Sequence, residues 1–405
     1  MADPAAKPPA GKIPWLNRTV VGVGLASLFS DWAHEAATTV LPVFLASFGA
    51  AAAWLGLIEG LADGLASFAK MGSGFYTDGL QRRQPIAVIG YMVTAVGTAS
   101  IGLATAAWHV LLARSLAWLG RGVRTPVRKA LLAAAVTKDT YGRAFGFERM
   151  MDTLGAIAGP ATALVLLTWL GHDYRRLFFL TLIPGLLAAA VIAFLVKEQE
   201  RKKVAHISFT DRLHALPPPY RRFLLGVGFF GAGDFAPTLL ILLATRQLTP
   251  EFGAARAASL AVGFYLLRNA SNAAGAPLAG WLADHFEKRR VLAAGYALAA
   301  VMALLIILGS ASLWILALIF VLSGLCAALT ETLEDSFCAE LVGEEQHGTA
   351  FGVLATVNGI GDFLSSTLVG ILWTVCGAAT AFSYCAGLFV LGAAFVLRAG
   401  RGRVA

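Results

Sequence analysis

The chain has 405 residues, of which 58% are hydrophobic and only 14% are charged, and its formal net charge at pH 7 is +8. A soluble domain carries about 25% charged residues, so this composition excludes a set of soluble domains with polar surfaces. The basic residues gather in short segments between apolar runs, which argues against a nucleic-acid partner and for a protein that lies in a lipid bilayer.

Apolar segments of about 20 residues, long enough to cross the hydrocarbon core of a bilayer, follow one another along the whole chain. Their apolar runs are continuous rather than alternating, which predicts membrane-spanning helices. The predicted spans are 20–46, 51–77, 85–106, 108–136, 142–170, 175–196, 221–247, 254–282, 290–309, 312–339, 347–375 and 378–397. We therefore predict an all-α membrane protein with twelve transmembrane helices.

The longest polar stretch, residues 197–220, divides these helices into two six-helix bundles. The predicted organisation is a polar, Pro-rich N-terminal tail (1–19), a first bundle (20–196), the linker (197–220), a second bundle (221–397) and a C-terminal tail (398–405). Basic residues concentrate in alternate loops, so the positive-inside rule predicts that both termini are cytoplasmic. The four cysteines lie in or at predicted helices without CxxC spacing, which indicates buried thiols.

Two sequence matches at one offset of 206 residues indicate that the two bundles arose by duplication. GFYTDGLQRR at 74–83 matches GWLADHFEKRR at 280–290, and GRAFGF at 142–147 matches GTAFGV at 348–353. An even number of helices in each half makes the repeat parallel, so the bundles are expected to be pseudo-symmetric. Transporters built from repeats commonly bind their substrate near the bilayer midplane between the halves.

These loops resemble the signature of the major facilitator superfamily (MFS), and the similarity covers nearly the whole chain. The two copies of the signature are Gly74, Asp78, Arg82 and Arg83, and then Gly280, Asp284, Lys288 and Arg289. The resemblance implies the MFS fold and a cytoplasmic lock in which each Asp pairs with an Arg across a tight loop. Arg114 resembles the family's fourth-helix arginine, and Gly155, Gly159 and Pro160 resemble its antiporter-associated GxxxGP element. The block GRGVRTPVRKAL is similar to that of bacterial drug and small-solute transporters.

Asp31, His34 and Glu35 share one face of the first predicted helix, which indicates a protonatable cluster. Pairing of these acids with arginines of the fourth helix fits the sequence equally well. A divalent-cation site is disfavoured because no other histidine lies at a matching depth, so we expect no metal and no cofactor. Further acids lie at similar depth on the second and seventh helices, with Asp63 beside Glu59. The predicted proton-coupling residues are Asp31, His34, Glu35, Glu59 and Asp234.

Arg114, Arg121 and Arg128 recur every seven residues and form a stripe on the fourth predicted helix, with Arg124 beside it. A charge at mid-depth costs about 2.5–3.5 kcal/mol unless it faces a partner or water, so the stripe predicts a polar cavity. The predicted substrate-cavity residues are Arg121, Arg124, Arg268, Asn269, Asn272 and Asp362. A hydrogen-bonded core position suits Asp362 equally well.

The repeat places Arg128 opposite Glu334 and Lys129 opposite Asp335, so one helix is basic where its twin is acidic. Two such surfaces predict a gate of ion pairs at the inner mouth, although local pairing of both clusters with Glu148, Asp152 or lipid headgroups is an alternative. Besides the loop signature, the predicted gate residues are Arg128, Glu148, Asp152, Glu331, Glu334 and Asp335.

The chain contains no GxxxxGK[ST], GxSxG or HExxH pattern, so we predict neither an ATP-driven pump nor an enzyme. The sequence predicts a monomeric secondary transporter of the bacterial inner membrane that works by alternating access. Its expected partners are a small-molecule substrate, protons and the lipid bilayer. Proton-coupled export by antiport of a small solute or drug, anionic or zwitterionic because of the arginines, is preferred. An uptake symporter, a lipid flippase and a transporter-like receptor without flux stay open as alternatives.

Overall fold

The computed structural model describes residues 14–48, 52–171, 173–198, 208–309 and 312–399, and helices dominate this part of the chain. The first half comprises α1 (Arg18–Ala46), α2 (Ala52–Asp78), α3 (Gln84–Ser100), η1 (Ile101–Leu103), α4 (Ala107–Ala134), η2 (Lys138–Thr140), α5 (Tyr141–Trp169), α6 (Tyr174–Leu180) and α7 (Leu182–Leu195). The short helix α8 (Phe209–His214) belongs to the linker. The second half comprises α9 (Pro218–Gly231), α10 (Pro237–Phe252), α11 (Ala254–His285), α12 (Lys288–Ile307), α13 (Leu313–Leu341), η3 (Glu344–Gln346), α14 (His347–Cys376) and α15 (Ala378–Ala399).

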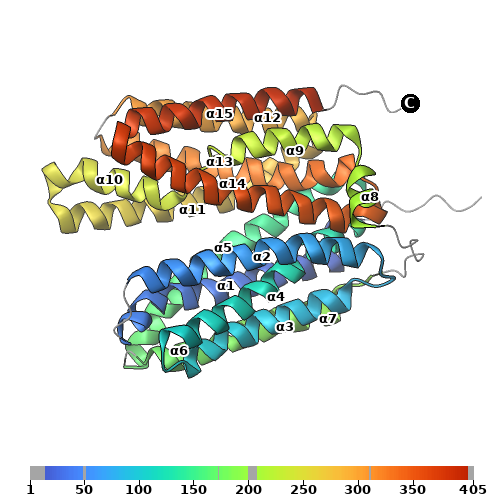
Figure 1. Ribbon diagram of the computed structural model, residues 1–405, viewed down its shortest axis with the longest axis horizontal. Coiled ribbons are helices and arrows are strands. Elements are labelled where there is room, and N and C mark those ends of the chain that lie inside the picture. The colour runs from blue at the N-terminus through green and yellow to red at the C-terminus, as the bar shows by residue number, and fades with distance from the viewer. Residues whose placement is uncertain (1–13, 49–51, 172, 199–207, 310–311, 400–405) are drawn as a thin grey trace, which may run out of the picture.

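The two halves form two helical bundles that lie side by side, with α8 at one end of the molecule (Figure 1). The predicted all-α membrane fold in two bundles is thus confirmed. Within the described ranges, seven helical stretches are long and apolar enough to cross a membrane by length and composition, so the count of twelve stays a prediction. Most of the predicted tails, 1–13 and 400–405, lies outside the described residues.

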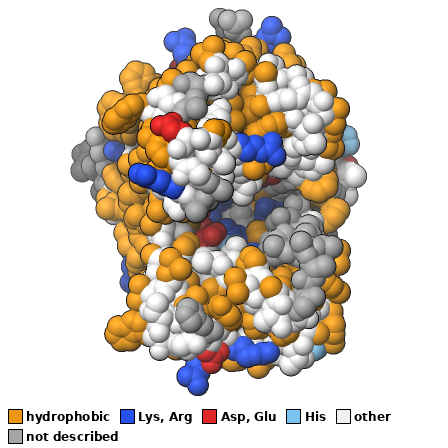
Figure 2. All heavy atoms as spheres, turned by 90° about the vertical axis from the view of Figure 1, so that its left-hand side faces the viewer, with side chains coloured by type: hydrophobic (Ala, Val, Ile, Leu, Met, Phe, Trp, Pro, Cys, Tyr) orange, Lys and Arg blue, Asp and Glu red, His pale blue; other side chains and the backbone are white. Residues whose placement is uncertain are grey.

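The outer faces of both bundles are apolar. Trp169 and Trp314 are each 86% exposed, and Phe68 and Phe194 are exposed as well. A soluble monomer rarely exposes so many large apolar side chains, whereas lipid tails accept them without cost. Figure 2 shows this apolar covering on the flanks of the molecule.

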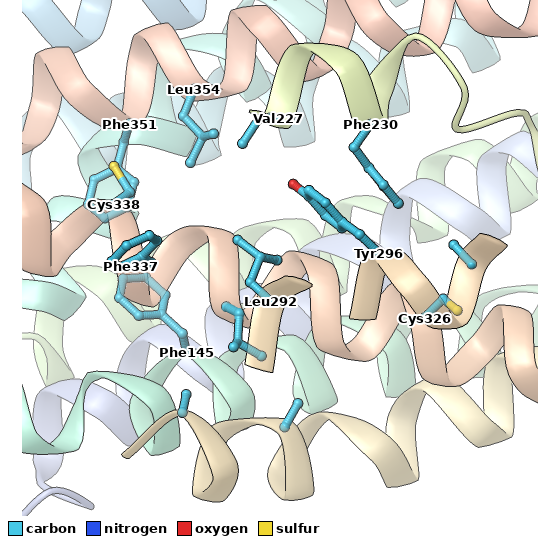
Figure 3. Packing of buried hydrophobic residues seen from close by; sticks show 14 of the residues in the cluster. Phe145, Val227, Phe230, Leu292, Tyr296, Cys326, Phe337, Cys338, Phe351 and Leu354 are labelled. Carbon is cyan, nitrogen blue, oxygen red and sulfur yellow. The ribbon is translucent and has the colours of Figure 1, made fainter. Parts of the chain in front are cut away.

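Buried aromatic rings pack within the second half and between the halves. Phe145 of α5 and Phe351 of α14 have ring centroids 5.7 Å apart, and Phe337 and Cys338 lie beside them (Figure 3). Within the second half, Phe230 stacks on Tyr296 with centroids 4.0 Å apart. Three of the four cysteines are buried as predicted, and Cys376 at the end of α14 is exposed instead.

The predicted span 221–247 is broken in the structure, because α9 ends at Gly231 and α10 begins at Pro237. Proline has no backbone N–H, and backbone groups freed inside a membrane need other partners. Ser365 donates a hydrogen bond to the Asp234 carbonyl over 2.5 Å, and Tyr384 donates one to the Ala232 carbonyl over 3.2 Å. The break therefore holds Asp234 on an unwound segment that α14 and α15 support.

The bundles meet closely at the end of the molecule that carries α8, which we call the linker end. A Cβ added to Gly74 would lie 2.2 Å from the Gly348 carbonyl oxygen, and one added to Gly142 would lie 2.3 Å from that of Gly280. A Cβ added to Gly64, farther from the linker end on α2, would meet no described atom within 4 Å. The halves are thus pressed together at the linker end, whereas Figure 2 shows a hollow between them at the opposite end.

Candidate functional site

A cavity of about 670 Å³ lies between the two bundles. Side chains of α2, α4 and α5 line it from the first half, and side chains of α13, α14 and the α9–α10 break line it from the second. Figure 2 views the molecule from the end opposite the linker and shows a hollow with acidic and basic side chains at its floor. The volume falls in the range of sites for small molecules, about 300–1,000 Å³.

The two walls of this cavity carry opposite charge. The charged lining residues of the first half are Lys70, Arg121, Arg124, Arg128, Lys129, Arg149, Glu148 and Asp152. Those of the second half are all acidic: Asp234, Glu331, Glu334, Asp335 and Asp362. The first wall is therefore net basic and the second purely acidic, so a field runs from one bundle to the other across the cavity.

Arg121 and Arg124 occupy the middle of the basic wall, as predicted for cavity residues. Arg121 Nη2 lies 3.2 Å from Asp31 Oδ1, and the buried Asp31 sits behind it. Arg124 is 1% exposed, donates a hydrogen bond to Ser30 over 2.6 Å, and lies over the Tyr91 ring at 4.2 Å from its centroid. One arginine thus has a carboxylate partner, while the other is held by a hydroxyl and a ring face.

The rest of the predicted first-helix cluster lies close to this wall. The His34 ring packs edge-on against Trp118 with centroids 5.3 Å apart, and the Arg114 and Arg121 guanidinium groups lie 5.5 and 5.3 Å from that tryptophan ring. Arg114 also donates a hydrogen bond to Thr38 over 3.2 Å. Glu35 is half-buried where α1 packs on α5.

Four predicted residues, and Asp63 beside one of them, remain to be placed around this cluster. Gly155 and Gly159 sit against the α1 backbone, which explains why the GxxxGP stretch, with Pro160 inside α5, has small residues there. Glu59 and Asp63 lie in α2, but their side chains are outside the described part of the structure.

Arg128 pairs inside its own half, contrary to the predicted position opposite Glu334. It lies 2.8 Å from Glu148 and 3.7 Å from Asp152, and it donates a hydrogen bond to Ser27. Glu334 instead accepts hydrogen bonds from Tyr296 over 2.7 Å and Asn358 over 2.8 Å, both from the second half. The local alternative for Arg128 is therefore the observed one, because carboxylates of α5 lie nearer than those of α13.

Two ion pairs cross the cavity floor between the halves. Lys129 Nζ lies 2.7 Å from Asp335 Oδ1, which joins two positions that the 206-residue repeat superimposes. Arg149 of α5 pairs with Glu331 of α13 and with Asp152 of its own helix, the latter over 3.0 Å. Sequence reasoning missed Arg149, although its position between Glu148 and Asp152 was the available signal.

The signature aspartate of each half caps a helix of the other half. Asp78 accepts hydrogen bonds from the backbone N–H groups of Gly348 and Thr349 at the start of α14, over 2.8 and 2.7 Å. Asp284 accepts the corresponding bonds from Gly142 and Arg143 at the start of α5, over 2.7 and 3.1 Å. A carboxylate at a helix N-terminus satisfies donors that have no partner within the helix. These reciprocal caps hold the linker end closed.

The basic partners of the two loops differ from the predicted pattern. Asp78 pairs with Arg83 as expected, and the buried Arg212 of α8 adds a second guanidinium at 3.8 Å. Asp284 pairs with Arg143 of the other half over 2.7 Å, because Lys288 is engaged by Glu340. The remaining basic residues of the signature are Arg82, which is exposed, and Arg289, which pairs with Glu287.

Arg268, Asn269 and Asn272 do not line the cavity, so the structure contradicts this part of the prediction. Arg268 donates hydrogen bonds to Ser323 over 3.0 Å and to Asn269 over 3.2 Å, and Asn272 is buried. The α11 backbone at 268 and 272 packs on Gly324 of α13, which turns this face into the second bundle. Asp362 does line the cavity, on the acidic wall.

The sequence is similar to transport proteins along most of its length. The family model described as Major Facilitator Superfamily matches residues 23–267 and 223–403. An uncharacterized MFS-type transporter of Methanocaldococcus jannaschii is 26% identical over 363 residues, which cover 89% of each chain. The multidrug resistance protein MdtH of Citrobacter koseri is 29% identical over 161 residues, which cover 39% of each chain.

Solved structures share the fold. The human organic anion transporter MFSD10 (TETRAN) has a TM-score of 0.76 at 18% identity, with coverage of 94% of this chain and 99% of that chain. The fucose:proton symporter FucP of E. coli has a TM-score of 0.76 at 16% identity, with coverage of 95% and 100%. At these identities the likeness concerns the arrangement of the helices.

Proposed function

Because the chain belongs to the major facilitator superfamily, we propose that this membrane transporter exports a small charged solute in exchange for protons. The observation that carries the proposal is the charged cavity, which is closed at the linker end and open at the opposite end. Alternation with a state that opens at the linker end would carry a bound solute across the membrane. The proposal needs no enzymatic step, cofactor, metal or second copy of the chain, because one chain supplies both walls.

The charge of the loops supports a sidedness for this state. Arg82, Arg143 and Arg289 lie at the linker end, and the positive-inside rule assigns such loops to the cytoplasm. Both chain termini then lie in the cytoplasm, and the structure corresponds to the outward-open state. The partial similarity to a bacterial multidrug resistance protein supports export across the inner membrane.

Antiport requires a group that the proton and the solute occupy in turn. Among the predicted proton-coupling residues, Asp234 suits this role because its exposed side chain lines the acidic wall. Within the described residues, its carboxylate has no ion-pair or hydrogen-bond partner. A cationic group of the solute would bind the ionised carboxylate and leave when a proton neutralises it.

One observation favours an uptake symporter as the second candidate. Asp31 is the carboxylate paired with Arg121, and protonation of Asp31 would free this arginine for an anionic group of the solute. Proton and solute would then bind together, which is the condition for symport. The charged residues on both walls of the cavity favour a charged solute over the lipid flippase.

Flux into proteoliposomes with an imposed pH gradient tests the proposal and separates the two candidates. The probe is a radiolabelled compound selected by a thermal-shift screen of metabolites and drugs on the purified protein. Antiport concentrates the probe in an acidic lumen and symport in an alkaline lumen, whichever way the protein is inserted. We expect accumulation in the acidic lumen, which Asp234→Asn abolishes and the control Asp173→Asn retains. Accumulation in the alkaline lumen that Asp31→Asn abolishes would establish the symporter. Flux that is the same with an acidic and with an alkaline lumen would refute proton coupling.

A further inference from the structure

We infer that the cavity binds a zwitterion, with its anionic group on Arg124 of the first half and its cationic group on Asp234 of the second. This inference rests on the proposed transport function and specifies its substrate class. Two side chains on facing walls carry it, one buried cation and one exposed anion.

Arg124 differs from the other arginines of the cavity by its lack of a carboxylate partner. Arg121, Arg128 and Arg149 each lie against at least one carboxylate. Arg124 has only the Ser30 hydroxyl and the Tyr91 ring face, and its Nε has no hydrogen-bond partner in the described structure. Asp31 acts on Arg124 only from beyond ion-pair distance, since it is paired with Arg121. Burying a cation without a carboxylate in contact is costly, so a guanidinium that is 1% exposed and lines a cavity indicates a place for an anion.

Asp234 provides the complementary charge on the opposite wall. The unwound segment between α9 and α10 carries it, and Ser365 and Tyr384 fix the backbone of this segment by hydrogen bonds to Asp234 and Ala232. Asp362 lines the same wall and adds a second negative charge. In the described part of the chain no basic residue lines this wall, and Arg268 acts on Asp234 only from within the second bundle, so the wall favours a cationic group.

A ligand with one charge satisfies only half of this arrangement. A simple anion would neutralise Arg124 but face the acidic wall, and a simple cation would neutralise Asp234 but face the basic wall. A carboxylate matches the planar fork of a guanidinium in a bidentate pair, and an ammonium group matches a carboxylate. Both poles are therefore satisfied together only by a zwitterion, and the simplest zwitterion with these two groups is a compound of the amino-acid type, which carries a carboxylate and an amine.

Because the two poles bind to different bundles, a zwitterion can link the two walls of the cavity. A bound carboxylate pulls on α4, and the bound amine pulls on the α9–α10 break, so only the complete ligand draws the two walls together. An ester or an N-acyl derivative keeps one attachment and loses the other. We therefore expect the protein to distinguish the parent compound from both derivatives. Arg124 should distinguish the acid from the ester, and Asp234 the amine from the N-acyl compound.

Binding of matched triplets to the purified full-length protein in detergent tests the inference. The panel comprises the α-amino acids and the straight-chain ω-amino acids up to 8-aminooctanoate, each with its methyl ester and its N-acetyl derivative. We expect at least one parent zwitterion to bind about tenfold more tightly than both of its derivatives, which equals about 1.4 kcal/mol for each pole.

Two variants assign the poles. Arg124→Gln should remove the preference for the acid over the ester and keep the preference for the amine over the N-acetyl compound. Asp234→Asn should do the reverse. The matched controls are Arg246→Gln, whose side chain lies over Trp373 outside the cavity lining, and Asp173→Asn, whose carboxylate caps α6. Both controls should keep both preferences, and thermal midpoints within a few degrees of the parent protein show that each variant is folded.

Three results would overturn the inference: a panel in which no zwitterion binds, a panel in which every zwitterion that binds is matched by one of its derivatives, or variants that weaken all members of a triplet equally. Since the assay uses no membrane and no gradient, it is independent of proton coupling. Pole-specific binding without proton-driven flux would refute the proposed exchange and leave the ligand class standing. Proton-driven flux of a probe with a single charge would refute the ligand class and leave the exchange standing.

Discussion

At the scale of single residues, the basic wall shows three ways to keep an arginine inside a membrane protein. Arg128 is paired with acids of the next helix and Arg121 with Asp31 behind it, whereas Arg124 contacts only neutral groups. The sequence predicted that the stripe faces a cavity, because seven-residue spacing sets one helix face. It could not predict which acid each arginine meets, since α4, α5 and α13 supply acids at similar depth and a distance of one turn decides the partner.

The pair between Lys129 and Asp335 yields a prediction at this scale. Lys129→Asp sets two carboxylates against each other across the cavity floor, so the linker end should close less well and pH-driven uptake should fall about tenfold or more. The double variant Lys129→Asp with Asp335→Lys restores the pair and should recover uptake to within about threefold, since charged groups in contact couple by about 0.5–3 kcal/mol. Initial uptake rates into proteoliposomes measure both.

A second charge-swapped pair of residues serves as the control for the Lys129–Asp335 double variant. Arg128 and Glu334 line the same cavity but pair within separate halves, so Arg128→Glu combined with Glu334→Arg should stay as impaired as the single variants. Rescue of this exchange together with failure of the Lys129–Asp335 exchange would contradict the observed pairing.

At the scale of the elements, the most informative contacts are the caps that cross between the halves. The Gly–Asp–basic loops and the GRAFGF and GTAFGV stretches were each recognised from sequence, at the ends of the helices where the structure has them. Their mutual contact was not, because Asp78 and Gly348 are 270 residues apart and no local pattern records such a pairing. The sequence likewise did not predict the break between α9 and α10, because GAGDFAP lies within one continuous apolar run.

Two glycines of α2 allow a matched test of the closure between the halves. Gly74→Ala places a methyl group against the Gly348 backbone and should force α2 and α14 apart, whereas Gly64→Ala meets open space in the described structure. The backbone N–H groups of Gly348 and Thr349 donate to Asp78, so their hydrogen exchange should become about tenfold faster or more in Gly74→Ala. Mass spectrometry of peptides from the start of α14 measures this exchange. Equal exchange in the two variants would show that the close glycine contact does not hold the linker end.

At the scale of the whole molecule, composition and repeat were sufficient to predict a helical membrane protein with two similar bundles and a polar site between them. The apolar outer faces and the charged interior both follow from the same chemistry, because lipid surrounds the bundles and water enters only the cavity. The state of the molecule could not be predicted, since closure at the linker end depends on glycine contacts and caps that join the two halves. These contacts make the observed state the one that opens away from the linker.

The central claim, that the halves alternate access to the charged cavity, is tested most directly by measuring distances across both ends of one molecule. Spin labels at Ser47 and Glu251 report on the open end, and labels at Lys138 and Glu345 report on the linker end. All four of these side chains are exposed. Double electron–electron resonance on Gly74→Ala and on the Gly64→Ala control compares the two pairs. The account predicts that Gly74→Ala lengthens the distance at the linker end and shortens the one at the open end, while Gly64→Ala changes neither. Distances that change in the same direction at both ends, or only at the linker end, would contradict it.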